Sequence, residues 1–158
     1  MVIVVHRPHY VRVDPRLVAR IRAMAATWGW GLLTAAFLIG VAVPVWGLRL
    51  PAGQEISAVL WMVPAGGSVL VLLLSGVCLL GLRSTAKADW VETTQTGQLR
   101  RMLLGWWLAS IAFSGFACFV LMVDYPHLGT VLYTLMLVTV YVLTGIAYFR
   151  ARSLLKQF

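Results

Sequence analysis

The segment RSTAKADWVETTQTGQLRR, residues 83–101, is the one long polar interruption in an otherwise apolar chain of 158 residues. Over the whole chain, 61% of residues are hydrophobic and 11% are charged. A soluble domain usually carries about 25% charged residues, because charges have to cover its surface. The composition therefore predicts an integral membrane protein. Within it, segment 83–101 separates two apolar halves and is an active site, a docking surface or a linker.

Four apolar stretches are long enough to cross a membrane as helices. A bilayer core of about 30 Å requires roughly 20 apolar residues in a helix, and none of the four stretches contains Lys, Arg, Asp or Glu. Short links join the first stretch to the second and the third to the fourth, which predicts two antiparallel helical hairpins. The expected fold class is an all-α integral membrane protein with a four-transmembrane-helix bundle, built from spans 28–48, 56–82, 102–123 and 127–149.

The basic residues predict how the bundle lies in the membrane. Twelve of the 13 Lys and Arg residues fall in the N-terminal tail 1–27, the loop 83–101 or the C-terminal tail 150–158. Short segments rich in Lys and Arg stay on the cytoplasmic side, so both termini and the loop are predicted to be cytoplasmic. The compact chain, with more Arg than Lys, favours a bacterial inner membrane as its location.

Topology also explains the net charge of +8 without a nucleic-acid partner. Basic residues near the membrane surface attract anionic lipid headgroups, each by about 1 kcal/mol. We therefore predict headgroup anchors at Arg16, Arg20, Arg83, Arg100, Arg101 and Arg150.

The N-terminal tail contains the start of a helix. Asp14 can cap it and Pro15 suits its first position. The pattern predicts an amphipathic interfacial helix that runs into the first span, with an apolar face against lipid or a neighbouring subunit; this face consists of Leu17, Ile21, Met24 and Trp28. Residues 1–13 are rich in Val, so we expect an extended segment that only another chain would order.

Residue types that carry chemistry are sparse and poorly placed. His6 and His9 are the only close histidine pair, whereas a structural zinc site needs four ligands. Cys78 and Cys118 are expected at depths that differ by about 18 Å, at a rise of 1.5 Å per residue, which is far beyond the reach of a disulfide. We therefore predict no catalytic site, no metal site and no cofactor, and we do not expect an enzyme.

Small and polar residues form stripes along the spans. Such stripes let helix backbones approach, and hydroxyl groups can hydrogen-bond across helices for about 0.6 to 2 kcal/mol each. We predict packing seams with other spans or with a partner subunit at Ala36, Gly40, Ser110, Ser114, Cys118, Thr130, Thr134, Tyr141 and Gly145. Pro64, followed by Ala-Gly-Gly, either kinks the second span or breaks it, as in the discontinuous helices of some transporters.

Segment 83–101 contains no catalytic pair, which leaves a linker or a docking surface centred on Asp89, Trp90 and Glu92. Within it, Ser84 is expected to cap a short helical turn and Gly97 to break one. The favoured hypothesis is a non-catalytic scaffolding or accessory subunit of a multi-subunit bacterial inner-membrane complex, such as a secretion, transport or respiratory machine. It would pack against partner membrane helices and dock partners on its basic cytoplasmic face. The alternative is a small oligomeric membrane transporter or channel.

Overall fold

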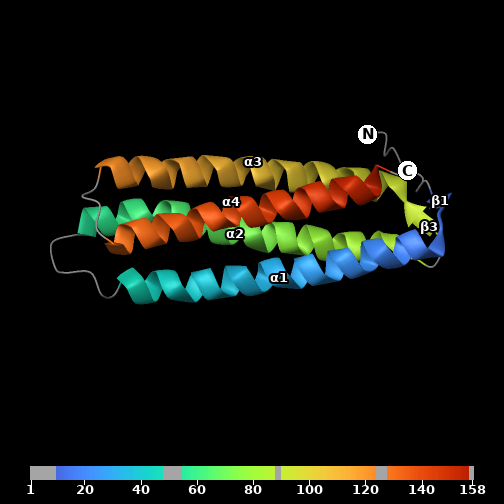
Figure 1. Cartoon of the computed structure of the whole chain (residues 1–158), viewed down its shortest axis with the longest axis horizontal. Coiled ribbons are helices and arrows are strands. Elements are labelled where there is room, and N and C mark those ends of the chain that lie inside the picture. Colours follow the sequence, from blue (N-terminus) through green and yellow to red (C-terminus); the bar gives the residue numbers. More distant parts are fainter. Residues whose placement is uncertain (1–9, 48–54, 88–89, 124–127, 157–158) are drawn as a thin grey trace, which may run out of the picture.

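The computed structural model describes residues 10–47, 55–87, 90–123 and 128–156. These residues form four long helices and three short strands, shown in Figure 1. The helices are α1 (Pro15–Gly47), α2 (Glu55–Thr85), α3 (Thr93–Val123) and α4 (Leu128–Leu155). The strands are β1 (Tyr10–Arg12), β2 (Ala86–Lys87) and β3 (Trp90–Glu92).

The four helices form a bundle of the membrane type. Each contains a stretch long and apolar enough to cross a bilayer, and these stretches are Pro15–Val43, Trp61–Thr85, Thr93–Val120 and Val131–Leu155. The helices pack mainly in chain order, α1 on α2, α2 on α3 and α3 on α4 (Figure 1). The predicted all-helical bundle of four transmembrane-length helices is therefore confirmed.

The helices extend beyond the apolar runs that predicted them. α3 begins at Thr93 rather than at Met102, so Gly97 lies inside a helix and does not break one. Ser84 does not cap a new turn, because it lies in the last turn of α2, where its Oγ donates a hydrogen bond to the carbonyl of Gly81 at 2.7 Å. Hydropathy detects only the part of a helix that meets hydrocarbon, so it misses these polar helical ends.

The predicted interfacial helix is the first part of α1, and Asp14 caps it. The Asp14 carboxylate accepts a hydrogen bond from the backbone N–H of Arg16 at 2.8 Å. The prediction that its apolar face contacts lipid or another subunit is wrong. Ile21 is fully buried and packs in one cluster with Leu82 of α2 and Leu155 of α4. The chain's own helices cover this face.

A three-stranded antiparallel sheet closes the same end of the bundle. Its order is β1-β3-β2, and Tyr10 lies opposite Glu92, Val11 opposite Val91 and Arg12 opposite Trp90. The predicted extended conformation is thus confirmed for residues 10–12, whereas residues 1–9, with His6 and His9, lie outside the described residues. For residues 10–12, the prediction that another chain must order the segment is wrong, because β1 pairs with β3 of the same chain.

Glycines set the spacing between neighbouring helices. Gly29 of α1 faces Gly76 of α2, and a Cβ atom at Gly76 would lie 3.0 Å from the Gly29 carbonyl oxygen. Nearer the start of α2, a Cβ atom at Gly67 would overlap the ring of Phe113 on α3. α2 runs as one helix through Pro64, so the structure does not show the break that the transporter alternative invoked.

Candidate functional site

The sheet lies at the end of the bundle where α1 and α3 begin and where α2 and α4 end (Figure 1). Every Lys and Arg residue within the described ranges belongs to this end. We call it the basic end. Two of the predicted docking residues, Trp90 and Glu92, belong to it, and so do all the predicted headgroup anchors.

Trp90 is exposed on the outer face of the sheet. Val91 is 1% exposed and packs into the bundle, and because side chains alternate along a strand, Trp90 and Glu92 face outward. Residues directly opposite one another in an antiparallel pair share a face, which places Tyr10 and Arg12 beside them. Trp90 is 45% exposed and Tyr10 is 50% exposed. Asp89, the remaining predicted docking residue, lies outside the described residues.

Buried hydroxyl groups join the sheet to the helices. The Thr96 hydroxyl donates a hydrogen bond to the carbonyl of Glu92 at 2.6 Å, in the first turn of α3. The Thr85 hydroxyl donates to the carbonyl of Leu82 at 2.9 Å, and the two hydroxyl oxygens lie 3.4 Å apart. The last turn of α2 and the first turn of α3 thus lie side by side at these two residues, and the bond from Thr96 to Glu92 positions β3 relative to α3.

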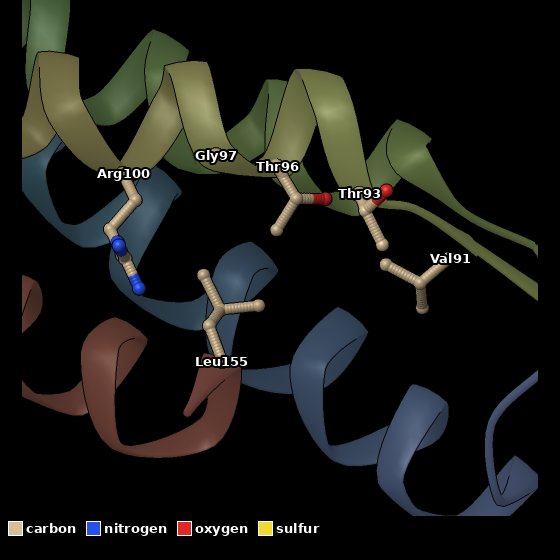
Figure 2. A pocket seen from close by; sticks show the side chains of 6 residues that line it. All are labelled: Val91, Thr93, Thr96, Gly97, Arg100 and Leu155. Atoms are coloured by element: carbon tan, nitrogen blue, oxygen red, sulfur yellow. The ribbon is translucent and has the colours of Figure 1, made fainter. Parts of the chain in front are cut away.

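A small cavity lies beneath the sheet, between the start of α3 and the end of α4. Figure 2 shows the six residues that line it, with Arg100 extending from α3 toward Leu155 of α4. Its volume is about 190 Å³, and its other lining residues are Val91, Thr93, Thr96 and Gly97. Its walls are mainly apolar, and the charged group that lines it is the Arg100 guanidinium.

A larger cleft of about 420 Å³ lies between α3 and α4, and Arg100 contributes to it as well. Cations line it from both helices: Arg100 and Arg101 from the α3 side, and Arg152 and Lys156 from the α4 side. All four are exposed. Leu104 and the aromatic residues Trp107, Tyr148 and Phe149 complete the lining. We call this site the α3–α4 cleft.

Ring stacking fixes the aromatic wall of the α3–α4 cleft. The Trp107 indole stacks on Tyr148 with ring centroids 5.6 Å apart and on Tyr141 at 6.1 Å. Phe149 meets Trp107 edge to face at 5.1 Å. Gly145 makes room for this arrangement, because a Cβ atom there would lie 2.8 Å from the indole nitrogen of Trp107.

The interface between α3 and α4 brings together part of the predicted small and polar stripes. Ser110 Oγ lies 3.1 Å from Thr144 Oγ1, and both residues are buried. Ser114 Oγ donates a longer hydrogen bond to the carbonyl of Leu137 at 3.4 Å. Thr134 is also buried, whereas Cys118 is half-buried. Thr130 belongs to α4, but its side chain lies outside the described part of the chain.

The remaining predicted positions are separate from this interface. Ala36 is buried in the central core with residues of α2 and α4. Gly40 is not tightly packed, since a Cβ atom there would have its nearest neighbour at 3.9 Å, on Val69. Arg16, Arg20 and Arg83 are exposed, and the Arg150 guanidinium lies over the Trp28 ring at 5.8 Å. Cys78 and Cys118 are free thiols.

Sequence reasoning missed several residues of these sites. Tyr10 and Arg12 were assigned to the tail, because a three-residue strand has no sequence pattern of its own and only its pairing with β3 places them beside Trp90. Arg152 and Lys156 were counted only as topological charges, but their spacing of four residues puts them on one side of a helix. Thr144 lies one residue before Gly145 and was outside the predicted stripe. Among the described residues, no group of three or more His, Cys, Asp or Glu could hold a metal ion.

Comparison with known proteins assigns no family: no family model, curated protein or solved structure matches the chain.

Proposed function

We propose that the chain is a non-catalytic accessory subunit of a multi-subunit bacterial inner-membrane assembly. Its basic end would face the cytoplasm, and the outer face of the sheet would dock a partner there. The observation that carries the proposal is the pair of exposed aromatic residues, Tyr10 and Trp90, on a sheet that is anchored to two helices. Tyr, Trp and Arg are the residue types enriched at the centres of protein interfaces.

The sheet is suited to docking because its residues are already ordered, so they lose little conformational entropy when a partner binds. Trp90 lies on a strand paired on both sides, and the buried neighbour Val91 fixes the direction of its side chain. A rigid anchor residue loses less conformational freedom on binding than a residue in a loose loop.

The membrane faces of the bundle are consistent with contacts to partner helices. Phe37 is 71% exposed and Leu38 is 61% exposed on α1. An apolar groove of about 330 Å³ lies between α1 and α4 and is lined by Leu38, Ile39, Met136 and Leu143, among others. A neighbouring transmembrane helix could pack in such a groove through close van der Waals contact.

Replacement of Trp90 by Ala tests the docking proposal. The full-length chain carries an affinity tag, is expressed in its own membrane and is solubilised in mild detergent. The Trp90→Ala chain should insert normally but recover at least tenfold less of any stoichiometric partner, because a buried aromatic anchor contributes about 2 kcal/mol or more to an interface.

Phe119→Ala is the control, because Phe119 is an aromatic residue of α3 that is 60% exposed but lies neither on the sheet nor in the α1–α4 groove. It should leave partner recovery unchanged. Full partner recovery by Trp90→Ala would mean that segment 83–101 is only a linker.

A further inference from the structure

The α3–α4 cleft is not part of the proposed docking surface on the sheet, and its lining has a distinct composition. It combines four cations, Arg100, Arg101, Arg152 and Lys156, with an aromatic wall. Within the described part of the chain, no carboxylate lies in ion-pair contact with any of these four side chains. Four positive charges therefore meet in one cleft, and none of its described lining residues is a carboxylate.

The two kinds of side chain lie at different depths along the helices. On α3, Trp107 lies seven residues from Arg100, which is about 10 Å along the helix axis at 1.5 Å per residue. On α4, Tyr148 lies four residues from Arg152, about 6 Å by the same rise. The cations thus lie toward the aqueous end of the cleft and the aromatic rings toward the apolar part of the bundle.

This order matches the layout of a phospholipid at the membrane surface. Arg side chains bind phosphate oxygens through paired N–H groups, and Lys adds a compact charge. Aromatic rings lie favourably at the level where headgroups meet acyl chains. Basic pockets between transmembrane helices are a recognised way to bind lipid phosphates.

We infer that the α3–α4 cleft is a specific site for an anionic phospholipid with two phosphate groups, of the cardiolipin type. One cation pair comes from each helix, so two phosphates can each be neutralised, while the acyl chains lie along Leu104 and Phe149. Phe149 is 50% exposed, which leaves an apolar surface open to the chains. The site belongs to the isolated chain and does not depend on the accessory-subunit proposal.

Native mass spectrometry of the full-length chain in lipid-free mild detergent tests this inference. The probes are cardiolipin, phosphatidylglycerol at the same phosphate concentration, and zwitterionic phosphatidylcholine. The wild-type chain should bind one cardiolipin with at least tenfold preference over both other lipids. Inorganic pyrophosphate at the same phosphate concentration should not displace it, because it cannot contact the aromatic wall.

Two double variants, each of which loses two positive charges, distinguish lipid binding at the α3–α4 cleft from electrostatic attraction by the net charge of the chain. Arg152→Gln with Lys156→Gln removes the α4 pair and should weaken cardiolipin binding roughly 30-fold, at about one decade in affinity for each 1.4 kcal/mol. Arg16→Gln with Arg20→Gln removes two exposed charges of α1 outside the cleft and should change binding less than threefold. All four side chains are exposed, so an unchanged circular dichroism spectrum is expected for both.

Three results would overturn the inference. Equal weakening in the two double variants would show attraction by net charge and not by the cleft. Equal binding of phosphatidylglycerol would remove the requirement for two phosphates in one molecule. Complete displacement by pyrophosphate would identify a site for a free anion instead of a lipid.

Discussion

Gly29 of α1 and Gly76 of α2 face each other so closely that neither position has room for a side chain. A Cβ atom at Gly76 would lie 2.9 Å from Leu33 Cγ and 3.0 Å from the Gly29 carbonyl oxygen. The corresponding atom at Gly29 would lie 3.2 Å from the Gly76 carbonyl oxygen. Close backbone approach through small residues stabilises helix pairs in membranes, where helices gain little from the hydrophobic effect.

Gly76→Ala should therefore destabilise the bundle. The added methyl group forces α1 and α2 apart, and overpacking of this kind typically costs about 1 to 3 kcal/mol. The free energy of unfolding in mixed detergent micelles, followed by circular dichroism, measures the effect. Gly105→Ala is the control, since nothing lies within 4 Å of a Cβ atom there. Equal stability of the two variants would show that the α1–α2 interface is looser than described.

The buried hydroxyls of Ser110 and Thr144 should be coupled across the α3–α4 interface. Their oxygens lie 3.1 Å apart, and hydrogen bonds of this kind average about 0.6 kcal/mol in double-mutant cycles in membrane proteins. A cycle of Ser110→Ala and Thr144→Val in the same unfolding assay should give a coupling of that size. The control cycle uses Thr139→Val, because the exposed Thr139 hydroxyl donates to Leu135 in its own helix. Identical coupling in the two cycles would contradict the contact.

The sheet register predicts a specific cross-strand disulfide. Tyr10 and Glu92 are direct neighbours, and opposite Cα atoms in an antiparallel pair lie about 4.5 to 5.5 Å apart, which suits a disulfide. Tyr10→Cys with Glu92→Cys, in a chain with Cys78→Ala and Cys118→Ala, should oxidise readily in the isolated protein. Val11→Cys with Glu92→Cys should not, because a shift of one residue points the two thiols to opposite faces. Electrophoretic mobility before and after reduction separates the two outcomes, and equal oxidation of both pairs would refute the register.

The four helices could be predicted from the sequence because each apolar run matches the bilayer thickness. Their polar ends could not, since residues such as Thr93 and Gly97 carry no hydrophobic signal. The contacts of Ile21 could not be predicted either. The spacing of apolar residues around Ile21 shows that this part of the helix has an apolar face, but not whether lipid, a partner or the chain's own Leu155 lies against that face.

The sheet and the cleft depend on contacts between distant parts of the chain. Three-residue strands such as β1 and β3 are too short to give a sequence pattern, and only their pairing defines them. The α3–α4 cleft likewise requires Arg101 and Arg152 to lie on facing helices, which follows from helix rotation and not from composition. Trp90 could be singled out from the sequence because it is an aromatic residue in a polar segment.

The central claim is that the chain works as one subunit of a larger assembly, and its mass in gentle detergent tests that claim most directly. The tagged chain is purified from its own membrane at native expression level and weighed by native mass spectrometry. We predict a complex that contains the 17.4 kDa chain and at least one different membrane protein in fixed stoichiometry. A monomer, or an oligomer of this chain alone, would contradict the proposed function.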